Sequence, residues 1–137
     1  MRFRNLAAAI AVGLLAMSPI TGCKMDSSLL QNMGGMEGLT KFNDAFGTNL
    51  LADPAVSKFL DAAAVDMVKR GITTEVAKIS GIPLPSEGVD LKAVLKEKNM
   101  DKGAKKGFKA SAEKATKDVA LSPAASKGMM SLTNGAL

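Results

Sequence analysis

One apolar stripe between residues 65 and 79 constrains the fold more than any other feature of the sequence. Its members recur every three or four positions, as on one face of an α-helix: Val65, Val68, Ile72, Val76 and Ile79. The following Ser80-Gly81 provides the glycine that commonly ends a helix. Prolines at positions 83 and 85 then exclude a helix from the next segment. We therefore predict one long amphipathic helix here, the clearest in the chain.

Further helix signals precede this stripe, and no strand pattern competes with them. A tether over residues 25–32 is expected to end in a short helix before Gly34-Gly35 interrupts the chain. The next helix should run to about Ala52, with an apolar stripe of Met36, Leu39, Phe42, Phe46 and Leu50. Asp53-Pro54 then combines an N–H-binding cap with a first-turn proline, which predicts a short helix reaching Phe59-Leu60.

Three more helices are predicted after the proline-containing loop. Asp90 should start a short helix to about Lys98, with Leu91, Val94 and Leu95 on one face. A second helix should start at Asp101, and its inward residues are Ala104, Phe108, Ala112, Ala115 and Val119. Ser122-Pro123 should start the last helix, which we expect to be weakened by Gly128 and frayed at Asn134-Gly135. The fold class predicted from these signals is all-α.

The amino-terminal segment is predicted to lie outside this helical fold. Arg2 and Arg4 precede an apolar run over residues 6–17, and no further charge occurs before Lys24. A basic start followed by a short apolar stretch and small residues is typical of a secretory signal peptide. The uncharged segment is also about long enough for a membrane-spanning helix, so a retained anchor is the alternative.

The segment Ile20-Thr21-Gly22-Cys23 resembles the bacterial lipobox, in which an aliphatic residue and two small residues precede a cysteine. The resemblance implies cleavage before Cys23 and a stable anchor of several acyl chains on this residue. Cys23 is the only cysteine of the chain, and its alternative state is a free or buried thiol. Lys24 replaces the aspartate that favours inner-membrane retention, which points to the outer membrane on its periplasmic side. The expected division is a signal peptide (1–22), a lipidated cysteine with a tether (23–33) and a helical domain (34–137).

Three landmarks stand in order along the helical domain. Gly34-Gly35 precedes the helix with Phe46, a corner at residues 50–54 leads to Phe59, and Gly81-Ile82-Pro83 ends the long helix. This ordered set resembles the group I truncated haemoglobins, most clearly before the last two helices. The resemblance implies a two-over-two helical sandwich, preceded here by the signal-peptide helix. It also implies haem between a long distal and a short proximal helix, with oxygen or nitric oxide as ligands.

The residues that perform haem chemistry in that family are replaced in this chain. The proximal histidine falls on Leu95, the distal tyrosine on Gly47 and the distal glutamine on Ile72. Leu95 cannot ligate iron, and the chain contains no histidine at all. Gly47 and Ile72 have no side-chain donor for bound oxygen. The other haem-pocket positions that the resemblance implies are Phe46, Phe59, Leu60, Val68, Glu75, Val76 and Leu91.

Leu95 is interpreted as a core leucine that fills the space of a haem. Gly47 on the opposite side leaves room for a residual apolar cavity, either collapsed or holding a small apolar ligand or lipid tail. Glu75 would be costly beside a porphyrin unless it were solvated or paired. Lys96 and Met100 are the candidate substitute iron ligands, although Lys96 should point about 100° away from Leu95 around the helix.

Residues 92–117 form a lysine-rich segment with nine lysines against three acidic residues. These lysines are Lys92, Lys96, Lys98, Lys102, Lys105, Lys106, Lys109, Lys114 and Lys117. The segment is either a solvated helix surface or a basic patch that contacts anionic headgroups or lipopolysaccharide, where each lysine contributes up to ~1 kcal/mol. Nucleic acid is not an expected partner, because the chain has no arginine cluster and no aromatic stacking platform.

These features together predict a non-catalytic lipoprotein of the bacterial envelope. Without histidine, a catalytic cysteine or clustered carboxylates, the usual catalytic sets and Cys/His zinc sites cannot be assembled, so no cofactor or metal is expected. The favoured function is binding of a partner or a small apolar ligand without His-ligated haem. The alternatives are haem-based binding of oxygen or nitric oxide through a non-histidine ligand, and a purely structural envelope lipoprotein.

Overall fold

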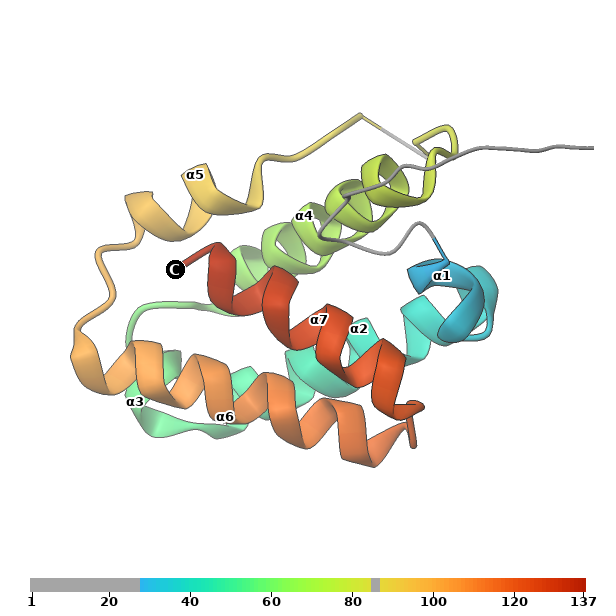
Figure 1. The fold of residues 1–137 in the computed structure, drawn as a ribbon. Coiled ribbons are helices and arrows are strands. Elements are labelled where there is room, and N and C mark those ends of the chain that lie inside the picture. The colour runs from blue at the N-terminus through green and yellow to red at the C-terminus, as the bar shows by residue number, and fades with distance from the viewer. Residues whose placement is uncertain (1–27, 85–86) are drawn as a thin grey trace, which may run out of the picture.

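The computed structural model describes residues 28–84 and 87–137, and all regular structure in them is helical (Figure 1). The predicted signal peptide, Cys23 and the start of the tether up to residue 27 lie outside these residues. The helices are α1 (Leu29–Asn32), α2 (Gly35–Ala52), α3 (Pro54–Ser57), α4 (Ala62–Ser80), α5 (Leu91–Glu97), α6 (Lys102–Asp118) and α7 (Pro123–Gly135). The predicted all-α fold class is therefore confirmed for this part of the chain.

Helix α2 connects the two halves of the core. It packs against both α4 and α6, and α6 in turn packs against α7. Phe42 and Phe46 of α2 meet Phe108 of α6 in a buried cluster, with ring centroids 5.6 Å apart for the first two and 5.0 Å apart for Phe46 and Phe108. The Phe46–Phe108 pair is edge-to-face, an arrangement that aromatic quadrupoles favour. This cluster joins the α2–α4 pair to the α6–α7 pair.

Five helices begin at a side chain that accepts a hydrogen bond from a backbone N–H of the first turn. These capping residues are Asp53, Asp61, Asp90, Asp101 and Ser122. Such caps satisfy N–H groups that have no partner within the helix. Four of them were predicted from the sequence, and so was the end of α4 at Gly81, whose φ of 70° lies in the left-handed region that glycine adopts without strain.

Two expectations about the helices are wrong, and a third stays a prediction. Met36 is 40% exposed rather than buried, because it borders a surface hollow with Leu84. Helix α7 does not fray at residue 134 but runs to Gly135, and the hydroxyl of buried Thr133 donates to the carbonyl of Met129 in its last turns. The weakening of α7 by Gly128 stays a prediction, and the glycine has a packing role as well, since a Cβ there would lie 2.7 Å from Leu29 Cδ1. The glycine lets α1 pack closely on α7.

The buried apolar cluster begins at Leu29 and ends at Leu132. A protein that starts at Lys24 therefore keeps every helix that the structure describes and the whole of this cluster. Among residues 28–84 and 87–137, no helix is both long enough and apolar enough to cross a membrane.

Candidate functional site

The structure brings the positions implied by the globin resemblance together, mostly as ordinary core. Eight of them are buried: Phe46, Gly47, Leu60, Val68, Ile72, Val76, Leu91 and Leu95. Phe59 is half-buried and packs against this cluster. Because α4 and α5 supply most of these side chains, the space between the two helices decides whether a planar cofactor fits.

Helices α4 and α5 touch directly at Gly71. A Cβ added to Gly71 would lie 2.9 Å from both Cα and Cβ of Leu91, closer than side-chain carbons approach in real structures. The backbone of α5 therefore rests on α4 at a point where only a hydrogen atom fits. Sequence reasoning missed Gly71, because a single glycine within an amphipathic pattern does not show which neighbour approaches it.

A polar contact fixes the entry into α5 beside Gly71. The hydroxyl of Thr74 accepts a hydrogen bond from the backbone N–H of Val89 at 3.0 Å and donates one to the carbonyl of Arg70 at 2.9 Å. Thr74 and Val89 are both buried, so a lost partner would leave an unsatisfied polar group. Thr74 therefore positions α5 on α4, a role that its place in the sequence did not reveal.

At the contact between Gly71 and Leu91, α4 and α5 leave no room for a haem. A planar ring between two helices needs about 7 Å between the atoms on its two faces, two van der Waals contacts of about 3.5 Å each. At Gly71 and Leu91 the helices leave no such gap. Leu95 is only 4% exposed and belongs to the same core cluster, as interpreted from the sequence.

The sequence left two states open beside Gly47, a collapsed cavity or one that holds a ligand, and the structure shows the collapsed state. A Cβ on Gly47 would lie 3.1 Å from Lys69 Cδ and 3.2 Å from Val65 Cγ1, so side chains of α4 occupy the space. The hollow that Gly47 borders is at the surface, with Thr48 and Leu51. Glycine at this position serves the close approach of α2 and α4.

The remaining candidates lie around α5. The Glu75 carboxylate is 37% exposed and lies 3.7 Å from Lys78 Nζ, so it is both solvated and paired. Lys96 is exposed and Met100 is buried, and both border a hollow between α5, the start of α6 and the end of α7. These two candidate iron ligands therefore lie at that hollow rather than at the Gly71–Leu91 contact.

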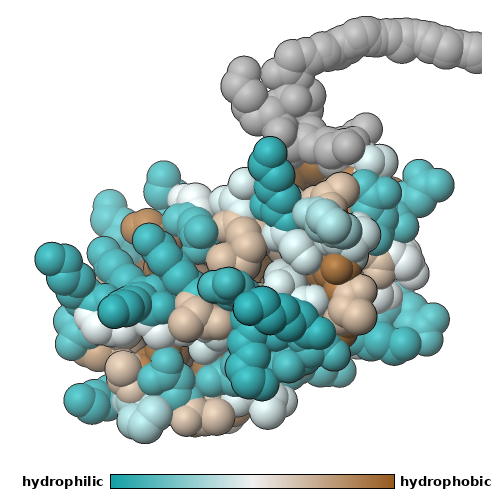
Figure 2. Space-filling model, turned by 60° about the horizontal axis from the view of Figure 1, so that its bottom comes forward, coloured by the Kyte–Doolittle hydropathy of each residue, from teal (hydrophilic) through white to brown (hydrophobic). Residues whose placement is uncertain are grey.

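The lysines of residues 92–117 fall into two groups. Lys114 and Lys117 form ion pairs with Asp118 and Glu113 at 3.1 and 3.6 Å. The other seven have no carboxylate within 4.0 Å in the part of the chain that the structure describes. We call these seven the unpaired lysine cluster: Lys92, Lys96, Lys98, Lys102, Lys105, Lys106 and Lys109. In Figure 2 the lower side of the molecule, where Figure 1 places α6, faces the reader, and hydrophilic side chains cover most of it.

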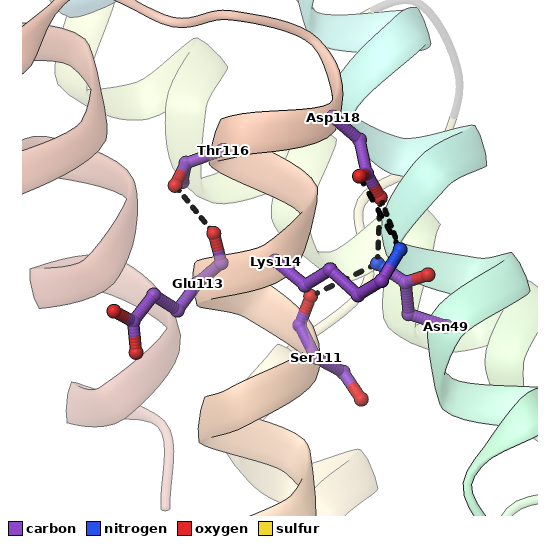
Figure 3. A network of polar contacts seen from close by, with 6 residues as sticks. All are labelled: Asn49, Ser111, Glu113, Lys114, Thr116 and Asp118. Carbon is purple, nitrogen blue, oxygen red and sulfur yellow. Dashed lines mark hydrogen bonds and ion pairs between the residues drawn. The ribbon is translucent and has the colours of Figure 1, made fainter.

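A polar network explains why the second half of α6 is neutralised (Figure 3). Asn49 of α2 donates to the carbonyl of Ser111 at 3.3 Å and to Asp118 Oδ2 at 3.2 Å, and Lys114 Nζ lies 3.1 Å from the same oxygen. These two donors hold the pKa of Asp118 below its usual value, the Asn49 bond more than Lys114. The network links α2 to α6, and the Asp118 carboxylate in it neutralises the charge of Lys114.

The site is thus defined by packing and charge rather than by a set of reactive groups. Among the described residues, no group of three or more His, Cys, Asp or Glu side chains could hold a metal ion. Comparison of the chain with protein-family models, with curated proteins and with solved structures gave no match.

Replacing Gly71 with alanine tests the α4–α5 contact. The added methyl must displace Leu91, and overpacking of this kind costs about 1–3 kcal/mol, against about 1 kcal/mol gained in helix propensity. We expect a net decrease in the free energy of unfolding, measured with urea. The matched control is Gly103→Ala, because a Cβ there meets only Asp101 Oδ1 at 3.6 Å and should not destabilise α6. Equal effects of the two substitutions would contradict the contact.

Replacing Asn49 with alanine tests the polar network. Because Asn49 is the largest cause of the lowered pKa of Asp118, this pKa should rise toward its usual 3.8 in an NMR titration of the carboxyl carbon. A lowered folded-state pKa stabilises the fold at higher pH, and this contribution is lost as the pH falls through the folded-state pKa. Asn49→Ala should therefore reduce the acid sensitivity of stability below about pH 4. The remote substitution Asn134→Ala should leave the titration of Asp118 unchanged, and an unchanged titration in Asn49→Ala would refute the assignment.

Proposed function

We propose that this chain is a bacterial envelope lipoprotein with a haem-free, truncated-haemoglobin-like domain that binds an anionic membrane surface. The globin-like part is supported by the packing of α2 on α4, of α6 on α7 and of α2 on α6, as expected for a two-over-two sandwich. The order of the landmarks from Gly34-Gly35 to Pro83 agrees with it. The lipoprotein part is supported by the sequence that ends at Cys23.

Two features of the interior support the proposal that the domain binds no haem. Leu95 stands where the family has its iron ligand, and the Gly71–Leu91 contact closes α5 onto α4. Neither Gly47 nor Ile72 offers a side-chain donor to a bound gas. In the described part of the chain, no group of three or more His, Cys, Asp or Glu side chains could hold a metal ion, and we therefore place the function at the surface.

The observation that carries the binding function is the unpaired lysine cluster. Its members lie on α5, on the connection to α6 and on the first half of α6, at one end of the domain (Figure 1). Lysines whose charges are not neutralised within the protein remain available to phosphate and carboxylate groups outside it. Each contributes up to ~1 kcal/mol close to an anionic bilayer. A lipid anchor would hold the domain near such a surface, so weak contacts suffice there.

Binding to vesicles tests this proposal. The protein from Lys24 to Leu137 should sediment with vesicles that contain phosphatidylglycerol and not with pure phosphatidylcholine vesicles. Changing Lys102, Lys105, Lys106 and Lys109 together to glutamine should weaken this binding at least tenfold at low salt. Added salt should reduce the difference, because ions screen exposed charges.

The matched control removes the same number of charges elsewhere. Lys41, Lys78, Lys114 and Lys117 are exposed and already paired with carboxylates, so changing all four to glutamine gives the same net charge. This variant should bind the vesicles within threefold of the unchanged protein. If both quadruple variants lose binding equally, net charge rather than the unpaired lysine cluster determines the interaction, and the proposal fails.

Acyl labelling tests the anchor. The full-length chain expressed in a Gram-negative cell should incorporate a labelled fatty acid, and Cys23→Ser should abolish the label because no other cysteine is present. The adjacent substitution Lys24→Ser should keep it. Labelling that persists in Cys23→Ser would refute the lipid anchor.

A further inference from the structure

A surface hollow of about 410 Å³ lies within the unpaired lysine cluster. It is bordered by α5, by the connection from α5 to α6, by the start of α6 and by the end of α7. The residues that line it are Lys92, Leu95, Lys96, Asn99, Met100, Lys105, Ala136 and Leu137. Its volume is within the range of small-molecule binding sites in proteins.

The hollow exists because α5 packs on a single helix. In the described part of the chain, α4 is the only helix that α5 contacts, and the chain then turns away through Asn99 at a left-handed φ of 50° before α6 begins. In Figure 1 the carboxyl-terminal end of α7 lies between α5 and the start of α6, and Ala136 and Leu137 line the hollow there. Three separate segments thus enclose a space that none of them fills.

The lining combines two kinds of surface. Leu95 and Met100 belong to the core cluster, and Ala136 and Leu137 are partly buried against it, so these four residues supply an apolar floor. Lys92, Lys96 and Lys105 are exposed and lack a carboxylate partner among the described residues, so they supply positive charge at the rim. An ammonium group is a donor only, with three N–H bonds to give. The rim therefore suits an anion, and the floor suits a hydrocarbon chain.

We propose that this hollow binds one anionic amphiphile, a single alkyl or acyl chain with a phosphate or carboxylate head. The head lies among Lys92, Lys96 and Lys105, and the chain lies along Ala136 and Leu137 above Leu95 and Met100. A bare anion would gain nothing from the floor, and a neutral chain would gain nothing from the rim, whereas the amphiphile uses both. This proposal deepens the proposed function, on which it rests for the source of the ligand at a membrane surface.

Titration calorimetry with three probes tests the ligand class, using the protein from Lys24 to Leu137. Dodecyl phosphate, kept below its critical micelle concentration, should bind saturably with one molecule per chain. Inorganic phosphate and dodecyl maltoside should each bind at least tenfold more weakly. If inorganic phosphate binds as tightly as dodecyl phosphate, the hollow is an anion site only. If dodecyl maltoside binds as tightly, it is an apolar site only, and either result overturns the proposal.

Variants locate the binding. The double change Lys96→Gln with Lys105→Gln should weaken binding of dodecyl phosphate at least tenfold. The matched pair Lys102→Gln with Lys109→Gln removes equal charge from lysines that do not line the hollow, and should change it less than threefold. Ala136→Phe adds bulk at a lining position and should also weaken binding at least tenfold, with an unchanged circular dichroism spectrum as the check of folding. Equal losses in the two lysine pairs would overturn the assignment to the hollow.

Vesicle sedimentation separates this proposal from the proposed function. Ala136→Phe should bind vesicles that contain phosphatidylglycerol within threefold of the unchanged protein, since every lysine remains. If dodecyl phosphate does not bind but the protein still binds vesicles, the proposed ligand of the hollow is wrong and the proposed function stands. Vesicle binding that is absent while dodecyl phosphate still binds one per chain would overturn the surface function and leave the hollow standing.

Discussion

Helix α5 can approach α4 closely because Gly71 has no side chain. With Leu91 Cα only 2.9 Å from where a Cβ would be, the two helices meet backbone to backbone, and Thr74 fixes the connection by accepting a hydrogen bond from the N–H of Val89. This contact closes the space in which a globin of this arrangement would hold a planar cofactor. Among the described residues, α5 contacts no helix other than α4, so its other side stays open toward α6 and α7.

Paired and unpaired lysines lie at opposite ends of α6. On the second half of α6, Asp118 and Glu113 neutralise Lys114 and Lys117, and Asn49 ties this region to α2. The unpaired lysine cluster begins at the other end, around the open side of α5. The tight packing against α4 thus lies on one side of α5, and the unpaired lysine cluster surrounds its other side. Under the proposed function, the interior between α4 and α5 is core, and the binding surface lies on the outside of α5.

The sequence predicted those features that depend on local patterns. Periodic apolar residues located the long helices, and Asp53, Asp90, Asp101 and Ser122 marked helix starts because a cap acts on its own first turn. Features that depend on distant neighbours were missed. Gly71 and Gly128 matter only through Leu91 and Leu29, which approach them from elsewhere in the chain. The sequence left the space beside Gly47 undecided for the same reason, since the side chains that fill it come from α4.

Absorbance spectroscopy of the protein from Lys24 to Leu137, titrated with haem, tests the central claim most directly. If α5 rests on α4 at Gly71 and Leu95 fills the remaining space, haem should give only the broad absorption of unbound or loosely adsorbed porphyrin, with no saturation at one haem per chain. A sharp Soret band that saturates at one haem per chain would contradict the claim. It would show that α4 and α5 separate to admit a cofactor.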